Sequence, residues 1–310
     1  MRQDRGIALL ITLWVMVLLS VVAMNLLLST RFGNASARNF KEETLAYYSA
    51  LSAYEEAAGY LLSDKDLSVD FKDEEGIFRT DTERPPVSGE KFYGTMTVQI
   101  DISDEESRLN INTIGEPVVK SLFEHAGIPE DSIPELMDSL SDWKDPDDLH
   151  RLSGAESDYY EDLDVPYQAK NRPLDMPEEL LLIKGFKPGY LYGAEDIAGI
   201  SSLITTTGLG VNINTAPAEV LVLSGMDPAL VEAIMTLRTK EAGGMRVTPP
   251  SSSGVAFSTA SWTFRIEVKA GIPESGRTVK ITAAVRRVSG LKGLELKTLY
   301  WKESIESGGA

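Results

Sequence analysis

Carboxylate side chains crowd into one short stretch near the middle of the sequence, SDWKDPDDLHRLSGAESDYYEDL, which begins at Ser141. Six of them lie within 17 residues, and Pro146 and Gly154 make the stretch an irregular loop: Asp142, Asp145, Asp147, Asp148, Glu156 and Asp158. Like charges this close are costly once desolvated. Calcium would neutralise them, because it accepts about six to eight oxygen ligands in loose geometry. The twelve-residue calcium loop of helix-loop-helix sensors is absent, so a solvated acidic loop remains the alternative.

The chain has few of the residues that other kinds of catalytic or metal site require. The chain of 310 residues has no cysteine and two histidines, His125 and His150, which argues against thiol chemistry, a histidine triad and a zinc site. Paired carboxylates could serve a glycosidase, but no separate cleft-forming architecture is indicated. We therefore expect no enzyme.

Charge is concentrated in the middle of the chain. The formal net charge is −17, and residues 101–200 hold 24 Asp and Glu against 8 Lys and Arg. Such a block repels phosphate backbones and attracts cations or basic partners. We expect no nucleic-acid partner.

The N-terminus predicts a membrane segment. Arg2 and Arg5 precede an uncharged run over residues 7–28, which is long enough to cross a bilayer. The positive-inside tendency leaves the N-terminus in the cytoplasm and the bulk of the chain outside. Three interpretations compete. In the first, the run is a signal peptide that is cleaved after the ASA of residues 35–37. In the second, it is a plain signal anchor. In the third, the chain is cleaved after Gly6 and the apolar run is retained, as in the class III signals of type IV prepilins and pseudopilins.

A long helix and a divided sheet are predicted around the acidic block. The apolar run continues into a helix ending near residue 63, with Gly33 and Asn34 the expected bend. One face of this helix is amphipathic and consists of Phe40, Thr44, Tyr47, Leu51, Tyr54, Ala58 and Leu61. Alternation predicts one strand in KFYGTMTVQIDIS and three in WTFRIEVKAGIP, RTVKITAAVRRVSG and LELKTLYWKE, joined by hairpin turns at PESG and SGLKG. The block between has no strand pattern, so it is predicted as a domain inserted into one sheet.

One motif occurs twice within that block. RLNINTIGEPVV, from Arg108, matches GVNINTAPAEVL, from Gly210. Each copy should begin a helix, the first with a capping box of Thr113 and Glu116, while the Asn side chains hold the turn. Glycine at the breaks in HAGIPEDSI, IKGFKPGYL and LSGMDPALV predicts three helical hairpins. Such hairpins can grip DNA, but the negative charge and the missing second glycine argue against it here.

The ordered set of motifs resembles one family. RGIALLITLW, DEESRLNINT, LSDWKDPDDLHRLSGAESDYY, YQAKNRPLDMPEELLLIKG and GVNINTAPAEVL, in this order, are similar to the minor pseudopilin K family of type II secretion systems over essentially the full length. The resemblance implies an α+β fold, in which a pilin-like long N-terminal helix packs on an antiparallel sheet with a large all-α domain inserted into it. We divide the chain into a prepilin leader (1–6), the N-terminal helix (7–63), a sheet domain (64–103 and 246–310) and the insert (104–245).

The resemblance also implies the site and the partners. Calcium is bound in the family's α-domain, and Asp142, Asp145, Asp147, Gly154 and Glu156 stand at the matching motif positions. The expected partners are other minor pseudopilins in a tip complex, the inner-membrane assembly platform and the prepilin peptidase. The peptidase would cleave after Gly6, and the chain would stay anchored in the bacterial inner membrane with its bulk in the periplasm.

Two positions in the apolar run bear on the role in the fibre. Most pilins carry Glu at the fifth mature position, which is Ile11 here, and its absence is the pattern of the pseudopilin placed at the tip. Ile7 stands where Phe or Met is usual, which bears on its N-methylation. The expected function is non-enzymatic: starting or capping the pseudopilus that supports export of folded proteins across the outer membrane. The alternatives are a minor pilin of a type IV pilus, for adhesion or motility, and a calcium-dependent periplasmic binding module.

Overall fold

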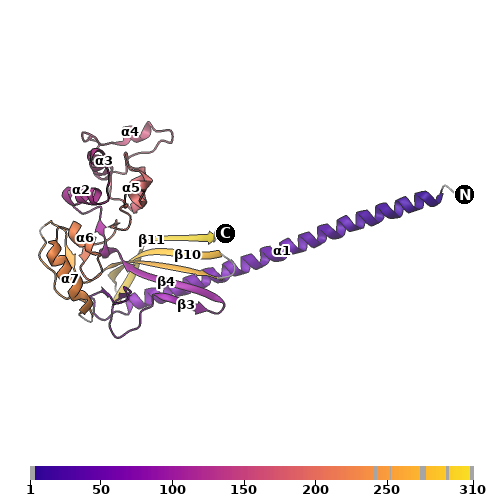
Figure 1. The fold of residues 1–310 in the computed structure, drawn as a ribbon, viewed down its shortest axis with the longest axis horizontal. Helices are drawn as coiled ribbons and strands as arrows, with labels where there is room; N and C mark the ends of the chain where they lie inside the picture. The colour runs from indigo at the N-terminus through magenta and orange to yellow at the C-terminus, as the bar shows by residue number, and fades with distance from the viewer. Residues whose placement is uncertain (1–3, 241–242, 252, 273–276, 291–292, 308–310) are drawn as a thin grey trace.

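A single long helix leads into a globular part at its C-terminal end (Figure 1). The structure is a computed structural model, and it describes residues 4–240, 243–251, 253–272, 277–290 and 293–307. Helix α1 (Asp4–Leu62) has 59 residues, about 90 Å at the standard rise. It is helical through Gly33 and Asn34, where we had expected the bend.

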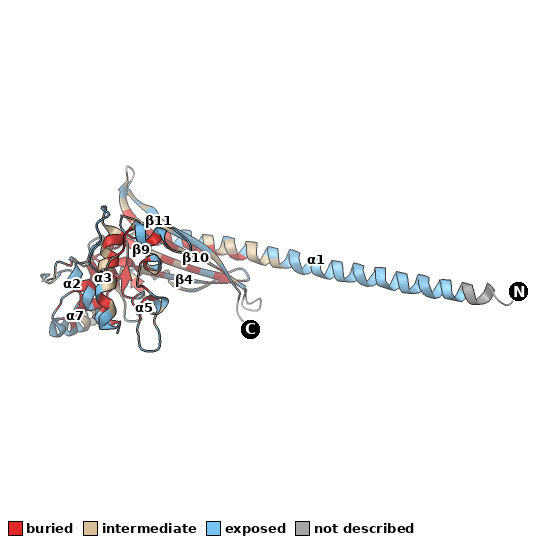
Figure 2. Ribbon diagram, turned by 90° about the horizontal axis from the view of Figure 1, so that it is seen from above, coloured by how far each residue is buried: buried red, intermediate tan, exposed pale blue. Residues whose placement is uncertain are grey.

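The first half of α1 is fully open to the surroundings, and the second half packs on the sheet (Figure 2). Over the described residues, one helical stretch, Leu9–Leu62, is apolar enough to cross a membrane, with a mean hydropathy of 2.4 in its best window and none of that window buried. Exposed side chains such as Leu9 and Trp14 have no protein partner along this half. The hydrocarbon core of a membrane would solvate these apolar side chains.

The packed face of α1 agrees with the predicted one over its last turns and differs at its start. The predicted Tyr54, Ala58 and Leu61 are buried, whereas Phe40 is 73% exposed. The buried face also contains four alanines that were not predicted, Ala46, Ala50, Ala53 and Ala57. Small side chains at spacings of three and four let the helix backbone approach the sheet closely.

The sheet is antiparallel, with strand order β11-β10-β9-β4-β3. Its strands are β3 (Gly89–Tyr93), β4 (Met96–Asp104), β9 (Thr263–Gly271), β10 (Arg277–Gly290) and β11 (Gly293–Ser307). The last three are the predicted C-terminal strands. The single strand predicted over residues 91–103 is instead a hairpin that turns at Gly94, which has φ +65°. The predicted turns at residues 273–276 and 291–292 lie outside the described residues.

One face of the sheet and the helix share a core. Strand β4 alternates buried and more exposed residues along its length, and its buried Val98 and Ile100 pack with Phe264, Ile266 and the alanine stripe of α1. The opposite face carries charged side chains such as Lys280 and Glu267, which pair at 2.9 Å.

The insert leaves the sheet between two neighbouring strands. β4 ends at Asp104, whose register partner on β9 is Phe264, although 159 residues separate them in the sequence. The helices of the insert are α2 (Glu116–His125), α3 (Ile133–Lys144), α4 (Ser157–Glu161), α5 (Pro188–Tyr192), α6 (Ala218–Leu223) and α7 (Pro228–Lys240). Its 3₁₀ turns are Glu105–Ser107, Glu130–Ser132 and Pro177–Leu182. The expected mixed fold, with a long helix, an antiparallel sheet and additional helices, is confirmed.

The insert has a hydrophobic core of its own, built around residues such as Phe123, Leu136, Tyr160 and Leu221. That core continues to Val255, ten residues beyond the predicted boundary at 245. The insert is also not purely helical. It contains two parallel pairs of two-residue strands, β5 (Leu109–Asn110) with β6 (Ile204–Thr205) and β7 (Val211–Asn212) with β8 (Phe257–Ser258). One more short pair, β1 (Phe71–Lys72) with β2 (Phe78–Arg79), precedes the main sheet.

Candidate metal centre

Both copies of the repeated motif have the same local structure. Asn110 Oδ1 accepts a hydrogen bond from the Asn112 N–H at 3.0 Å, and Asn212 Oδ1 accepts one from the Asn214 N–H at 2.9 Å. These bonds are the predicted turns held by Asn side chains. The capping box was a wrong prediction, because α2 begins after Gly115 without a side-chain cap.

The second Asn of each motif holds a distant segment. Asn112 receives the N–H of Leu174 and donates to the carbonyl oxygens of Leu174 and Thr206, at 2.9 to 3.1 Å. Asn214 does the same with the backbone of Met245 and Thr259, at 2.7 to 3.2 Å. Each motif thus joins the start of a helix to a loop far away in the sequence, which sequence reasoning did not anticipate.

The three predicted helical hairpins are present in outline. Gly127, Gly185 and Gly225, at the breaks, have φ values between +77° and +85°. A side chain at these positions would be strained. The first hairpin packs α2 against α3, and α3 then carries the chain into the acidic loop.

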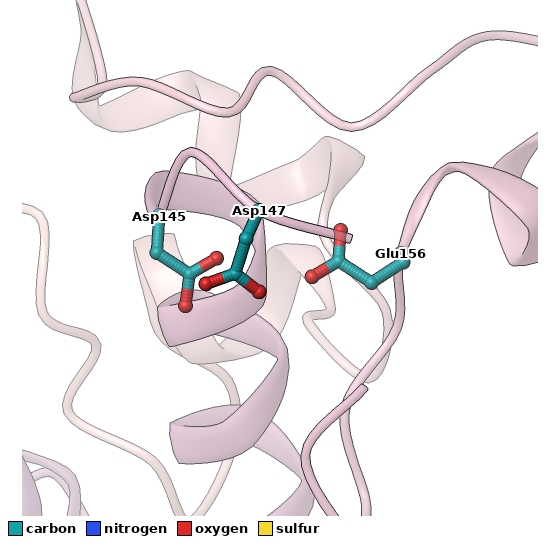
Figure 3. A group of neighbouring side chains, drawn as sticks. All are labelled: Asp145, Asp147 and Glu156. Atoms are coloured by element: carbon teal, nitrogen blue, oxygen red, sulfur yellow. The ribbon is translucent and has the colours of Figure 1, made fainter. Parts of the chain in front are cut away.

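The acidic loop connects α3 to α4. Helix α3 ends at Lys144, and Asp145 takes an extended conformation directly before Pro146. Asp145, Asp147 and Glu156 converge, with one carboxylate oxygen from each within 4.8 Å of the others. Figure 3 shows Asp145 and Asp147 side by side on the loop, with Glu156 facing them from the segment that enters α4. These three form the candidate centre.

A second layer of contacts fixes the loop. Asp142 is fully buried, and its Oδ2 accepts the N–H of Arg151 at 3.1 Å. Gly154 lies against the Asp142 carboxylate so closely that a Cβ there would collide with it. Lys184 Nζ donates to the carbonyl oxygens of Ser153 and Gly154, each at 3.1 Å. The loop therefore has a defined shape around the three carboxylates.

Several oxygens around the centre are buried and accept no hydrogen bond. They are one oxygen each of Asp142, Asp145 and Asn171, and both carboxylate oxygens of Glu156. Asn171 was not predicted. It adopts φ +50°, and its Nδ2 donates to Asp148 Oδ1 at 3.3 Å, which places it beside the loop. Buried polar atoms are normally satisfied, so this set of oxygens fits a cation.

Electrostatics at the centre agree with this fit. Burial, followed by the negative charges of Asp142, Asp145 and Asp148, raises the pKa of Glu156 to about 7. Burial also raises the pKa of Asp145, with added repulsion from Asp147 and Asp142. The carboxylates destabilise one another's charged forms, which a hard cation would reverse.

Besides Asp142, two predicted ligands, Asp148 and Asp158, lie outside the converging group of three. Asp158 is exposed and pairs with His150 at 2.9 Å, and Asp148 accepts the bond from Asn171. At the other end of the molecule, Gly6 and Ile7 lie in the first turns of α1, and Ile11 is exposed on the same helix.

Comparison with known proteins finds similarity to one family. Residues 101–192 match the model described as type II secretion system (T2SS), protein K. A putative type II secretion system protein K of Escherichia coli K12 is 24% identical over 69% of this chain and 66% of that protein, just under two thirds of its length. The type II secretion system protein K of Klebsiella pneumoniae is 27% identical over 78% of this chain and 77% of that protein.

The fold has a solved counterpart. A chain in the crystal structure of the GspK-GspI-GspJ complex from the enterotoxigenic Escherichia coli type 2 secretion system superposes with a TM-score of 0.63. The match covers 86% of this chain and 99% of that chain at 19% identity. The family model and the curated relatives support the resemblance to the type II secretion system protein K family, and the solved structure shares the fold.

Proposed function

We propose that this chain is a non-enzymatic minor pseudopilin that starts or caps the periplasmic pseudopilus of a type II secretion system. In that role it supports export of folded proteins across the outer membrane. Its similarity to type II secretion system protein K supports the secretion role. The apolar half of α1 supports an inner-membrane anchor, with the N-terminus in the cytoplasm and the globular part in the periplasm.

The location of the insert is the main observation in favour of a tip position. It forms a second core beyond the end of the sheet, on the side away from the N-terminus of α1 (Figure 1). Fibre subunits are added with their N-terminal helices side by side, so the next layer would have to fit over the globular part. The insert occupies that space, which favours a terminal position over an internal one.

The sequence of α1 supports the same position. Ile11 would be the fifth residue after cleavage at Gly6, where a carboxylate could pair with the N-terminal ammonium of a neighbouring subunit. A subunit with nothing ahead of it gains nothing from that carboxylate and would leave it unpaired in hydrocarbon. An apolar side chain is the better choice there.

Assembly requires partners and processing. We propose that this chain joins other minor pseudopilins in a tip complex, which the two further components of the solved complex support. We further propose that prepilin peptidase cleaves after Gly6, that Ile7 becomes the N-methylated first residue, and that the assembly platform of the inner membrane receives the mature chain.

We propose calcium as the ion of the acidic loop, held by Asp145, Asp147 and Glu156 with Asp142 behind them. The buried oxygens without donors and the mutual repulsion of the carboxylates support it. Calcium suits the site better than magnesium, because an irregular loop offers uneven ligand directions and magnesium requires near-octahedral geometry. The ion would hold the loop in shape, and no reaction is assigned to it.

Electron microscopy tests the tip position. An affinity tag after residue 310 should be labelled by immunogold at one end of each pseudopilus, and excess protein should shorten the fibres. Ile11→Glu should keep the label at the end, because the insert still obstructs the next layer. Regular labelling along the fibre, in the wild type or in this variant, would contradict the proposal.

A further inference from the structure

Four large apolar side chains are exposed around the acidic loop. Leu149 is 76% exposed and Leu152 is fully exposed, both on the loop itself, while Tyr159 on α4 and Leu182 in the last 3₁₀ turn are partly exposed. We call Leu149, Leu152, Tyr159 and Leu182 the distal patch. The loop and α4 lie at the end of the insert farthest from the sheet (Figure 1).

The members of the distal patch are connected through short contacts. Lys184 Nζ bonds the carbonyl of Ser153, next to Leu152, and lies 5.2 Å from the centre of the Tyr159 ring. Leu182, two residues before Lys184, accepts a hydrogen bond from the Tyr167 hydroxyl at 2.7 Å through its carbonyl oxygen. Lys184 thus holds the backbone beside Leu152 close to the Tyr159 ring.

The connection to Leu149 runs through charged groups. The Leu149 N–H donates to Asp147 Oδ1 at 2.9 Å, and His150 pairs with Asp158, the residue before Tyr159. Leu149 and Tyr159 thus each have a carboxylate close by. A patch of this kind, apolar within and charged at the edge, is typical of interaction surfaces.

The negative charge around the distal patch indicates which kind of partner it would bind. Residues 130–179, which contain the loop and most of the patch, carry 16 Asp and Glu against four Lys and Arg. A divalent ion at the acidic loop would cancel only two of these charges, so the surface stays strongly negative with the ion bound. An anionic membrane would be repelled, and a partner with basic groups around apolar ones would be attracted.

We propose that the distal patch is a docking surface for a basic amphipathic protein segment. Leucine and aromatic side chains of the patch would contact the apolar face of that segment, and the surrounding carboxylates would pair with its lysine or arginine side chains. Figure 1 shows α4 to one side of the α1 axis, with α6 and α7 at the end opposite the membrane anchor, so a partner can reach the surface from the side without disturbing α1.

A synthetic peptide tests this proposal. Full-length protein in phosphatidylcholine nanodiscs, with calcium present, is titrated against a fluorescein-labelled leucine–lysine amphipathic peptide, and binding is followed by fluorescence anisotropy. We expect saturable binding that weakens about tenfold in Leu149→Ser/Leu152→Ser, as loss of two central apolar contacts does in other interfaces. The matched control Leu209→Ser/Val247→Ser, which removes exposed apolar side chains elsewhere, should bind as the wild type does.

Two further experiments distinguish an amphipathic segment from a purely basic segment and from a membrane. A lysine–serine peptide of equal charge should bind at least about tenfold more weakly than the leucine–lysine peptide, because it lacks the apolar contacts. Sucrose-loaded phosphatidylcholine vesicles should not sediment the nanodisc-held protein. Equal binding of both peptides, unchanged binding in the patch variant, no saturable binding by the wild type, or sedimentation that depends on Leu149 and Leu152 would each overturn the proposal. Unchanged melting of the patch variant verifies that it is folded.

Discussion

Thr215 Oγ1 donates a hydrogen bond of 2.7 Å to Oδ2 of Asp104, across 111 positions of sequence. Asp104 is the last residue of β4 and Thr215 closes the second Asn-Ile-Asn-Thr motif, so this bond fastens the insert to the sheet. Both residues are buried. The same carboxylate oxygen also accepts from Ser261, just before β9, so the sheet's two strands and the insert meet at one carboxylate.

Removing this hydroxyl should destabilise the protein. We expect Thr215→Val to lower the free energy of unfolding by about 1–3 kcal/mol, because the buried Asp104 loses a donor and finds no water to replace it. Thermal melting of the full-length protein in detergent measures the effect.

The first motif supplies the control for this prediction. Thr113 is the equivalent residue and is exposed, with its Oγ1 bonded only weakly to the Asn110 carbonyl at 3.3 Å. Thr113→Val should change the unfolding free energy by less than about 0.5 kcal/mol. Equal effects of the two substitutions would show that the bond to Asp104 does not fasten the insert.

Calcium should stabilise the protein through the acidic loop. A ligand that binds only the native state contributes about 2.7 kcal/mol at a hundredfold excess over its Kd, so the full-length protein in detergent should melt higher in calcium than in chelator. Asp145→Ala/Asp147→Ala should lose this gain, and so should Gly154→Ala, whose methyl group would displace Asp142.

Other acidic residues nearby make the matched control for the calcium experiment. Asp158→Ala/Asp164→Ala removes two exposed carboxylates outside the converging group, and this variant should keep the gain in melting temperature. A wild type that melts alike in calcium and in chelator contradicts the metal site.

Stability should fall as the pH rises from about 5 to 8. Burial, followed by the charge of Asp104, raises the pKa of Glu106 from 4.5 to about 8. In that interval the unfolded chain has released the Glu106 proton and the folded chain still holds it, so each increase in pH favours unfolding. We expect a loss on the order of 1–3 kcal/mol, which levels off above the folded pKa.

Glu106→Gln should make this pH dependence shallower, because the amide is neutral in both states while Glu156 still titrates in the same interval. The comparison variant is Glu124→Gln, which changes an exposed acid on α2 and should leave the slope as it is. Urea unfolding at pH 5.5, 6.5, 7.5 and 8.5 supplies the measurement. An unchanged slope in Glu106→Gln assigns the titration to another group.

The mature chain should begin at Ile7. Mass spectrometry of the intact protein from membranes should show loss of residues 1–6, and Gly6→Leu should leave a longer, unprocessed chain, since a bulky residue blocks the cleavage position. Gly33→Leu, at a position in α1 with no neighbouring atom within 4 Å of an added Cβ, should be processed normally. A native N-terminus beyond Ala37 would show that the run is a cleaved signal peptide.

The sequence by itself determined the elements whose signals are local. Alternation gave the three C-terminal strands, uninterrupted apolar residues gave the first half of α1, and glycine marked the turns of the helical hairpins, because each pattern reflects the conformation of the residues that carry it. The Asn turns of both motifs were predictable for the same reason. The buried face of α1 was predicted in part, at Tyr54, Ala58 and Leu61, whereas its alanines were not, because alanine occurs on buried and exposed helix faces alike.

Only the tertiary structure decided which carboxylates converge. Six acidic residues in one loop look equivalent in sequence, yet Asp145, Asp147 and Glu156 face one another while Asp158 turns to His150. The difference arises from packing beneath the loop, where Asp142, Gly154 and Lys184 fix its path. Asn171 and the bond from Thr215 to Asp104 were equally hidden, since a contact between distant segments leaves no periodic trace in either one.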